Sequence, residues 1–233
     1  VPGGSRGIGL GCAVALAEAG AHVLIAARSA DEVEASVAAM TASGFSAEGR
    51  ALDVTDLESV DALCAEKQFD ILCNSAGLAR HGPALEASQD DFDLVININM
   101  KAAYFMAQSI AKYAVGPASI IQISSQMGHV GGIERSVYCG TKHALEGFTK
   151  AQAIEWGPRG IRINTICPTF IRTPLTEATF QNPERVAWIK EKIKLDRIGE
   201  VEDIMGAVVV LASDAAALIT GTSLVVDGGW TAG

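Results

Sequence analysis

The chain has 233 residues, of which 49% are hydrophobic and 19% are charged, and its formal net charge at pH 7 is −9. The length suits one α/β domain, and the apolar share allows a large core and argues against a disordered chain. The acidic balance and the lack of clustered lysines and arginines argue against nucleic-acid binding, which needs such clusters to hold phosphates.

A glycine-rich stretch, GGSRGIG, occupies residues 3–9 and leads into an apolar helical pattern that ends at Gly20. Glycines in such a place let the backbone turn tightly and approach a pyrophosphate, whose charge a helix N-terminus favours. The spacing of Gly3, Gly7 and Gly9 is G-x-x-x-G-x-G, which differs from the G-x-G-x-x-G of many dinucleotide sites. Taken alone, the stretch is equally compatible with an ordinary turn.

Short apolar runs alternate with helical patterns along the rest of the chain. Runs without polar alternation predict strands of a parallel sheet that helices cover on both faces. The predicted strands are 22–27, 69–74, 119–124, 161–166 and 223–227. The predicted helices are 8–20, 29–44, 56–67, 88–114 (two helices or one bent helix), 137–157 and 200–213. This order predicts a doubly wound, Rossmann-type α/β fold with a single domain over 1–233.

Small or polar residues follow two of the predicted strands, at the edge of the sheet where ligands bind in open α/β folds. Residues 73–77, CNSAG, would let the backbone approach a cofactor or would simply form a tight turn. Ser125 is either a ligand-binding residue or an ordinary loop serine. Asn99 lies in an otherwise apolar helical pattern, where a buried amide needs partners from a polar network or a core hydrogen bond.

Tyr138 and Lys142 stand four residues apart in a predicted helix and therefore share one face. A free tyrosine has a pKa of about 10, and a nearby ammonium group would favour the phenolate and lower that pKa. Such a pair can take a proton from an alcohol or give one to a carbonyl oxygen. For this pair alone, a surface contact without chemistry is the simpler interpretation.

The five cysteines are odd in number and form no C-x-x-C pair, which predicts free thiols and a cytoplasmic location. No apolar run approaches the ~20 residues of a membrane-spanning helix, so no membrane contact is expected. The four histidines show no spacing typical of a metal site, and none is predicted.

Taken together, these segments resemble the short-chain dehydrogenase/reductase family from end to end of the chain, in the family's order and spacing. The matching pieces are GGSRGIG (3–9), LDV (52–54), NSAG (74–77), Asn99, Ser125, YCGTK (138–142), ICPTFIRTP (166–174) and VDGG (226–229). The resemblance implies an enzyme that moves a hydride between a nicotinamide cofactor and a secondary alcohol or ketone.

The resemblance also implies a role for each matching residue. Tyr138 would be the general acid and base, Lys142 would lower its pKa and bond the nicotinamide ribose, and Ser125 would hold the substrate oxygen. Asn99 would hold a water in a proton relay behind Lys142. The residues that would orient the nicotinamide amide are Pro168, Thr169, Ile171 and Thr173. The other cofactor-binding residues that it implies are Gly3, Ser5, Arg6, Gly7, Ile8, Gly9, Arg28, Ser29, Asp53, Val54, Asn74, Ala76 and Gly77, together with Tyr138 and Lys142.

The chain departs from the family pattern at three residues and in the strand before the glycine loop. A threonine that braces the glycine loop is replaced by Pro2, which has no hydroxyl and no N–H, so weaker cofactor binding is expected. The family's Asn-Asn-Ala-Gly reads Asn-Ser-Ala-Gly, and its Pro-Gly reads Pro168-Thr169. The strand before the loop is reduced to Val1 and Pro2, and because losing it would leave sheet edges unpaired, we expect a longer protein.

Basic residues favour NADP(H) as the cofactor. Arg28 and Ser29 follow the strand 22–27 and Arg6 lies in the glycine loop, which resembles the family's NADP pattern. An arginine there accommodates the 2′-phosphate. NAD(H) stays possible because Asp31 and Glu32 lie close by, and an acid at that place bonds the ribose 2′-hydroxyl.

Residues 168–199 match the family's variable substrate lid. Its apolar side chains, which we expect mainly to pack against each other, are Phe170, Leu175, Phe180, Trp188 and Ile189. Gln126, Met127 and His129 follow Ser125 and are candidates for the pocket wall. Hydrogen bonding by Gln126 and His129 favours sugars, polyols or hydroxyketones as substrates.

Two other functions stay open at the level of sequence. A 3-oxoacyl-thioester reductase is the main rival within the family, although an acidic surface suits an acidic carrier protein poorly. A catalytically silent dinucleotide-binding protein is the alternative from another class, and the intact set of Asn99, Ser125, Tyr138 and Lys142 argues against it. The helix 137–157 and the last strand resemble family surfaces that form dimers and tetramers, so a homo-oligomer is expected.

Overall fold

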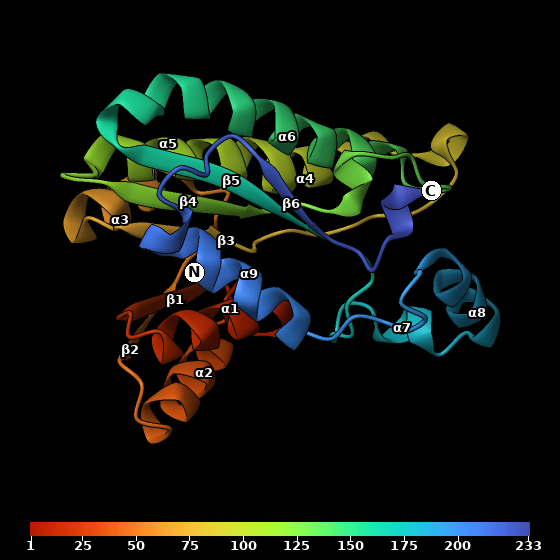
Figure 1. The fold of residues 1–233 in the computed structure, drawn as a ribbon, viewed down its shortest axis with the longest axis horizontal. Helices are drawn as coiled ribbons and strands as arrows, with labels where there is room; N and C mark the ends of the chain where they lie inside the picture. Colours follow the sequence, from red (N-terminus) through yellow and green to blue (C-terminus); the bar gives the residue numbers. More distant parts are fainter.

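Six parallel strands form the centre of the structure, a computed structural model that describes residues 1–233 (Figure 1). The strands are β1 (Val23–Ala27), β2 (Ala47–Ala51), β3 (Ile71–Asn74), β4 (Ala118–Ile123), β5 (Ile161–Pro168) and β6 (Ser223–Val226). β1 pairs with β2, and β3, β4, β5 and β6 pair in that order, all in parallel. The predicted doubly wound α/β fold is therefore confirmed.

The first three residues connect the two groups of strands. The backbone N–H of Gly3 donates to the carbonyl of Ala26 at 2.8 Å, and Ala26 donates to the carbonyl of Val1 at 3.1 Å. On the other side, Ser75 donates to the carbonyl of Pro2 at 3.0 Å. Residues 1–3 thus run between β1 and β3, and Pro2 uses its carbonyl there without needing the N–H that it lacks.

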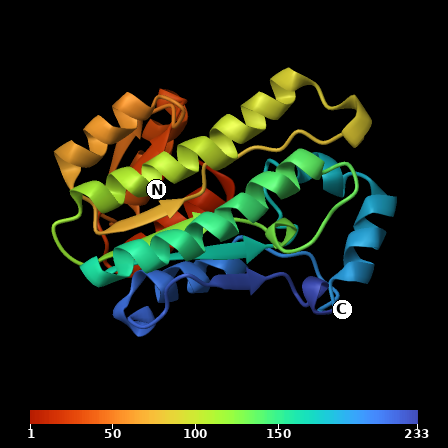
Figure 2. The ribbon, with the colours of Figure 1, turned by 90° about the horizontal axis from the view of Figure 1, so that it is seen from above.

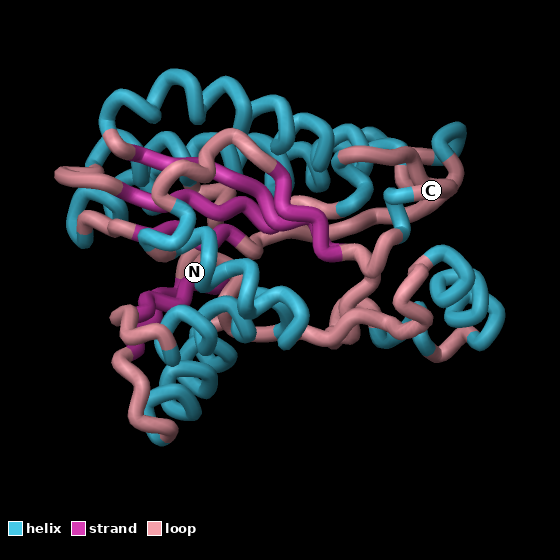
Figure 3. Tube along the Cα trace, viewed as in Figure 1, coloured by secondary structure: helices cyan, strands magenta, loops and turns pink.

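Helices cover both faces of the sheet, as the trace and the view from above show (Figures 2 and 3). One face carries α1 (Gly7–Glu18), α2 (Ala30–Ala42) and α9 (Glu202–Ala212). The opposite face carries α3 (Leu57–Lys67), α4 (Gln89–Ile96), α5 (Ala103–Tyr113) and α6 (Ser136–Trp156). None of these helices combines the length and the apolar character needed to span a membrane.

Two elements differ from the predicted ones. The segment 88–114 is one helical path in which a π-helical turn, Asn97–Ala102, joins α4 to α5. Strand β2 was absent from the predicted strands, because its sequence AEGRA has no buried apolar residue. Its position comes from pairing with the buried strand β1 rather than from its own side chains.

The core lies in two layers, one on each face of the sheet. Strand β4 is buried along its whole length, and its isoleucines alternate between the layers. Ile121 packs with α1 and α9 residues such as Cys12 and Val208, whereas Ile120 packs with α5 residues such as Met106. Burying each such side chain stabilises the fold by about 1.5–3 kcal/mol.

The predicted lid forms a separate small layer beyond the sheet. It contains α7 (Glu177–Phe180) and α8 (Pro183–Lys192), which lie beyond the ends of β5 and β6 (Figures 1 and 2). The Phe170 and Trp230 rings stack with centroids 5.7 Å apart, and Trp188 meets Trp230 edge-on at 5.2 Å. Phe170 and Trp188 of this segment therefore both pack on Trp230 near the C-terminus, around the buried cluster of Ile189, Ile193 and Ile198.

Candidate active site

A cavity of about 790 Å³ opens at the carboxyl ends of the strands. Its wall is built by the glycine-rich loop, the segments that follow β1, β3, β4 and β5, and the first turns of α6. Ligand pockets of proteins commonly measure about 300–1,000 Å³, and the cavity lies in the upper part of this range.

The glycine loop is shaped by close approaches of backbone to backbone. Gly3 has φ +72°, and a Cβ there would lie 2.8 Å from the backbone nitrogen of Ala76. A Cβ on Gly9 would collide with the carbonyl oxygen of Gly3. Gly7 has φ +54° and begins α1, so the N-terminus of this helix faces the cavity with its free N–H groups. This geometry favours a bound phosphate.

The cavity has two ends, and the glycine loop lies at one of them. Acidic and basic side chains surround the loop at that end. Glu32 accepts a hydrogen bond from Ser5 at 3.0 Å and pairs with Arg6 at 3.3 Å. Arg28 is exposed in the cavity wall and forms no ion pair. Asp53 accepts hydrogen bonds from the backbone and hydroxyl of Thr55, which lower the pKa of its carboxyl group.

At the other end, Ser125, Tyr138 and Lys142 meet in the cavity wall. Ser125 follows β4, and its Oγ accepts a hydrogen bond from the backbone of Met127 at 3.1 Å. Lys142 is 5% exposed and its Nζ donates to the carbonyl of Ile123 at 2.9 Å. Its Nζ lies 5.6 Å from the centre of the Tyr138 ring. One face of α6 thus carries Tyr138 and Lys142 to the end of β4, where Ser125 lies.

The pKa values of Tyr138 and Lys142 are both shifted by burial. Burial raises the pKa of Tyr138 above its usual 10, while the Ser125 hydroxyl and the Arg135 guanidinium act in the opposite direction. Burial lowers the pKa of Lys142 to about 8, against the attraction of Cys167 and Glu146. The sequence predicts that Lys142 lowers the pKa of Tyr138, whereas in this structure burial is the larger effect and the net shift is upward.

Two asparagines support the cavity from behind and do not line it. Asn99 lies in the π-helical turn, where its side chain accepts from the N–H of Leu78 at 2.9 Å and donates to the carbonyl of Leu78 at 2.8 Å. Asn74 accepts from the backbone N–H of Ala76 at 3.1 Å and donates to Gln122 at 2.7 Å. Both amides hold the chain in place after β3.

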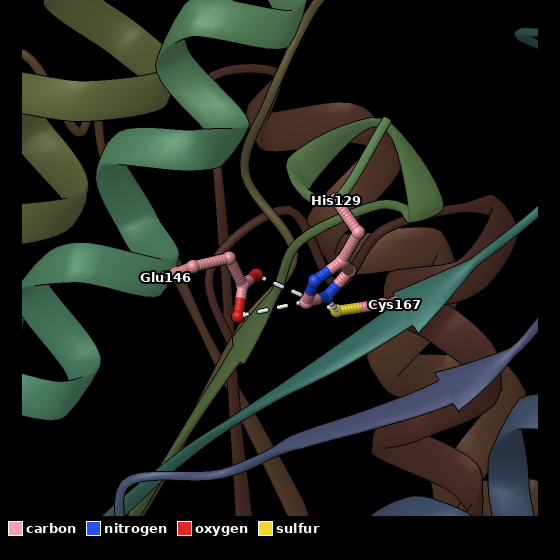
Figure 4. A group of neighbouring side chains, drawn as sticks. All are labelled: His129, Glu146 and Cys167. Atoms are coloured by element: carbon pink, nitrogen blue, oxygen red, sulfur yellow. Dashed lines mark hydrogen bonds and ion pairs between the residues drawn. The ribbon is translucent and has the colours of Figure 1, made fainter. Parts of the chain in front are cut away.

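The sequence-based set of site residues is brought together almost completely. Apart from Gly9, Asn74 and Asn99, every residue of that set lines the cavity. Gln126 and Met127 line it as well, whereas the side chain of His129 does not. His129 turns away because it lies beside Glu146 of α6 and Cys167 of β5 (Figure 4).

His129, Glu146 and Cys167 form a mostly buried polar cluster next to the cavity (Figure 4). The His129 Nε2 is 3.4 Å from the Cys167 sulfur and 3.9 Å from a Glu146 carboxylate oxygen. Glu146 also accepts hydrogen bonds from Thr165 at 2.8 Å and from Ser223. These contacts link α6 to β5 and β6 directly behind Lys142, which lies one turn earlier in α6.

Arg135 and His81 are among the residues of the wall that the sequence-based set does not contain. Arg135 immediately precedes α6, and its Nη1 lies 2.8 Å from Nε2 of His81. The His81 ring meets the Tyr138 ring edge-on with centroids 5.9 Å apart. Neither residue belongs to an apolar run or a recognised motif, so only the fold reveals their position.

The donors of the cavity fit a nicotinamide dinucleotide. Side chains added at Gly3 or Gly9 would collide with the chain's own backbone, so at these positions the loop has only backbone to present to a pyrophosphate. The hydroxyl oxygens of Ser124 and Thr169 are buried without hydrogen-bond partners, and both residues line the cavity, so these hydroxyls are available to a bound ligand.

Comparisons with known proteins agree with this arrangement. Residues 3–231 match a family model described as enoyl-(acyl carrier protein) reductase. The D-threitol dehydrogenase of Mycolicibacterium smegmatis is 39% identical over 238 residues, which cover 99% of this chain and 91% of that protein. The gluconate 5-dehydrogenase of Gluconobacter oxydans is 34% identical and covers 99% of this chain and 93% of its own length.

A solved structure has the same fold over the whole chain. It is a gluconate 5-dehydrogenase from Burkholderia cenocepacia J2315 in complex with NADP and tartrate. It is 30% identical to this chain, covers 100% of it and 94% of its own chain, and superposes with a TM-score of 0.96.

Proposed function

This chain belongs to the short-chain dehydrogenase/reductase family, and we propose that it is an NAD(P)-dependent oxidoreductase of sugars, polyols or hydroxyketones. The observation that carries this proposal is the meeting of Ser125, Tyr138 and Lys142 in one cavity with the glycine loop. The reaction interconverts a secondary alcohol and a ketone.

The comparisons favour this substrate class over the alternatives. Relatives that match nearly the whole chain are named for D-threitol, gluconate and L-xylulose, which are polyols, sugar acids and sugars. These names argue against a 3-oxoacyl-thioester reductase, although the family model carries the name of an acyl-carrier-protein enzyme. They also argue against a silent binding protein, because all of these relatives are dehydrogenases or reductases.

The chain's own residues account for the proton transfer. A bound nicotinamide supplies a hydride acceptor for oxidation and a hydride donor for reduction. In the oxidation, Tyr138 as phenolate takes the hydroxyl proton of the alcohol, and in the reverse reaction its phenol returns a proton to the carbonyl oxygen. Ser125 is the donor that holds the substrate oxygen while charge develops on it. The Lys142 ammonium would stabilise the phenolate and hold the nicotinamide ribose of a bound cofactor.

NADP(H) is the favoured cofactor, with NAD(H) possible. Arg28 supports NADP(H) because this exposed cation has no ion-pair partner and is available to a 2′-phosphate. Glu32 is occupied by Ser5 and Arg6 and is therefore less available to a ribose hydroxyl. The related Burkholderia enzyme was solved with NADP.

We also propose that the protein acts in the cytoplasm as a homo-oligomer. All five cysteines are free and buried, which suits a reducing compartment. Strand β6 lies at an edge of the sheet with Leu224 and Val225 partly exposed, and α6 exposes Ile154, so apolar surfaces are present for subunit contacts.

Replacing Tyr138 with phenylalanine tests the mechanism. We expect Tyr138→Phe to lower kcat by about 10²–10⁴-fold, the usual contribution of general acid–base catalysis. Binding of NADPH, followed by its fluorescence, should change little. Tyr104→Phe is the matched control, since Tyr104 packs against Phe105 and Phe148 away from the cavity. Undiminished turnover of Tyr138→Phe would show that the assigned mechanism is wrong.

The preference between NADPH and NADH is tested with the unaltered enzyme. Catalytic efficiency with NADPH and NADH should differ by about tenfold or more in favour of NADPH, since a charge-assisted contact to phosphate is worth about 1.5–3 kcal/mol. A clear preference for NADH would contradict the assignment to NADP(H) while leaving the reaction type intact.

A further inference from the structure

Arg135 is a cation in the substrate end of the cavity that has no acidic partner. It forms no ion pair, because the adjacent Glu134 is paired with Arg185 at 3.5 Å. Its one side-chain hydrogen bond joins Nη1 to the Nε2 of His81 at 2.8 Å. A guanidinium has five N–H donors in a planar fork, so most of them remain free for a ligand.

The side chain is held in place by two other segments of the chain and by its own loop. Its guanidinium carbon lies 5.2 Å from the centre of the Phe170 ring, and His81 fixes one of its nitrogens. Its Cδ lies so close to Gly132 that a Cβ there would approach to 2.9 Å. A guanidinium fixed in this way loses little freedom when it binds an anion.

The charges that line the cavity are divided between its two ends. The acids of the wall, Glu32 and Asp53, both lie at the end that contains the glycine loop and the end of β1. At the end that contains Tyr138, the charged residues of the wall are Arg135 and Lys142, and both are basic. His81 adds no charge that competes with an anion, since burial and the neighbouring arginines lower its pKa to about 4.

A second polar group in the same wall lacks a partner. Gln126 is 1% exposed, and both atoms of its side-chain amide are buried without a hydrogen bond. A buried amide of this kind costs free energy unless something bonds it. Gln126 directly follows Ser125, so hydroxyl groups of a substrate held at Ser125 are suitable partners.

From this arrangement we infer that the substrate is a polyhydroxy acid whose carboxylate binds the Arg135 guanidinium while its hydroxyls bind Gln126. A carboxylate matches the planar fork of arginine in two parallel hydrogen bonds, whereas a neutral polyol gains little from it. The inference rests on the proposed function, since it assumes that the alcohol reacts at Tyr138, and it narrows the substrate class from polyols in general to their acids.

Matched pairs of substrates test the inference in the intact protein. Each aldonate is compared with the alditol of the same carbon number: threonate with threitol, xylonate with xylitol, and gluconate with glucitol, all with NADP⁺. We expect kcat/KM for the best aldonate to exceed that of its alditol by about 10- to 100-fold, as a charged hydrogen bond provides. Raising the salt concentration should reduce kcat/KM for the acid and leave that for the alditol unchanged.

Variants locate the effect at Arg135. Arg135→Met should raise KM for the acid relative to KM for the alditol by about 10- to 100-fold, whereas Arg135→Lys should keep part of the preference. Because the guanidinium also acts to lower the pKa of Tyr138, any change in kcat should be shared by the acid and the alditol. Arg50→Met is the control for charge, since Arg50 pairs with Glu66 on the surface and does not line the cavity. If Arg135→Met does not fold, the effect of salt on kcat/KM of the unaltered protein still tests whether a charge binds the acid.

Two results would overturn the inference, and they separate it from the proposed function. Turnover of alditols with equal or greater efficiency than aldonates would overturn the carboxylate subsite alone. Turnover of no member of either series would overturn the subsite together with the proposed substrate class. An acid preference that survives in Arg135→Met would show that the carboxylate binds elsewhere.

Discussion

Lys142 is nearly excluded from solvent, although its charge has no carboxylate in direct contact. Its Nζ donates to the carbonyl of Ile123, and the nearest acid along the helix, Glu146, is bound to Thr165 and Ser223. The protein therefore carries the cost of desolvating an ammonium group at its catalytic end. Such a cost makes stability depend on pH.

We expect the free energy of unfolding to rise between pH 7 and pH 9.5 through Lys142. Its pKa is about 8 in the folded chain and about 10.5 when unfolded, so the folded state loses its proton first. Below pH 8 both states are charged and the folded state carries the full cost. Above pH 8 that cost disappears, which adds about 2 kcal/mol of stability by pH 9.5.

Urea unfolding of the cofactor-free protein and of Lys142→Met measures this effect. The difference in unfolding free energy between the two proteins should increase in favour of the unaltered chain as pH rises. Other titrating groups, including the cysteines with raised pKa values, are common to both proteins and cancel. A difference that stays constant over this range would mean that Lys142 holds its proton equally well in the folded and unfolded chains, so that burial does not lower its pKa.

At the scale of single residues, the sequence predicted the site residues that follow strands, but it did not predict the whole cavity wall. Ser125 and the segment after β3 were found because apolar strands make their ends recognisable. Arg135 and His81 lie in the long connections before α6 and after β3, where polar residues are common. Their meeting beside Tyr138 depends on three-dimensional packing, which spacing along the chain does not encode.

At the scale of elements, α1 and α9 approach each other at a glycine. A Cβ on Gly11 of α1 would collide with the side chain of Val201, the residue that precedes α9. Gly206, within α9 itself, is exposed and has open space around its Cα. Both glycines lie in helices, but only at Gly11 does the packing of α1 against α9 require the absence of a side chain.

Substituting alanine at each glycine distinguishes these roles. Gly11→Ala should lower the free energy of unfolding by about 1–3 kcal/mol, because the added methyl overpacks the contact between helices. Gly206→Ala should raise it by about 0.5–1 kcal/mol, because alanine favours helix more than glycine does. Thermal melting of both variants is the measurement. A stabilised Gly11→Ala would mean that α1 and α9 are less closely packed than described here.

The elements that the sequence predicted correctly are those with buried apolar runs. Strands β4 and β5 are buried almost throughout, and their sequences leave little alternative to a central parallel sheet. β2 could not be found in this way, because its partner β1 determines its conformation. The π-helical turn also escaped prediction, since it has the apolar periodicity of a helix and differs only in hydrogen bonding.

For the molecule as a whole, two of the exposed apolar regions bear on assembly. One lies on edge strand β6, where Leu224 is 37% exposed and the backbone has no second neighbour. The other lies on α6, where Ile154 is 79% exposed. Unpaired strand edges and exposed apolar side chains favour association with further copies of the chain.

We expect the protein to form tetramers through these two surfaces. Ile154→Glu and Leu224→Glu should each reduce the tetramer to a dimer, because a buried carboxylate at either contact is costly. The double variant should have the mass of one chain. Light scattering after size-exclusion chromatography gives these masses, and a single-chain mass for the unaltered protein would refute the expectation.

Helix α6 carries Tyr138 and Lys142 in its first two turns and exposes Ile154 near its other end. A neighbouring subunit in contact with Ile154 would restrain the orientation of α6, the helix that positions Tyr138 and Lys142. Catalysis and subunit assembly would then both depend on the position of α6. Specific activity should consequently fall when the enzyme is diluted until its subunits separate, even though no residue of the cavity has changed.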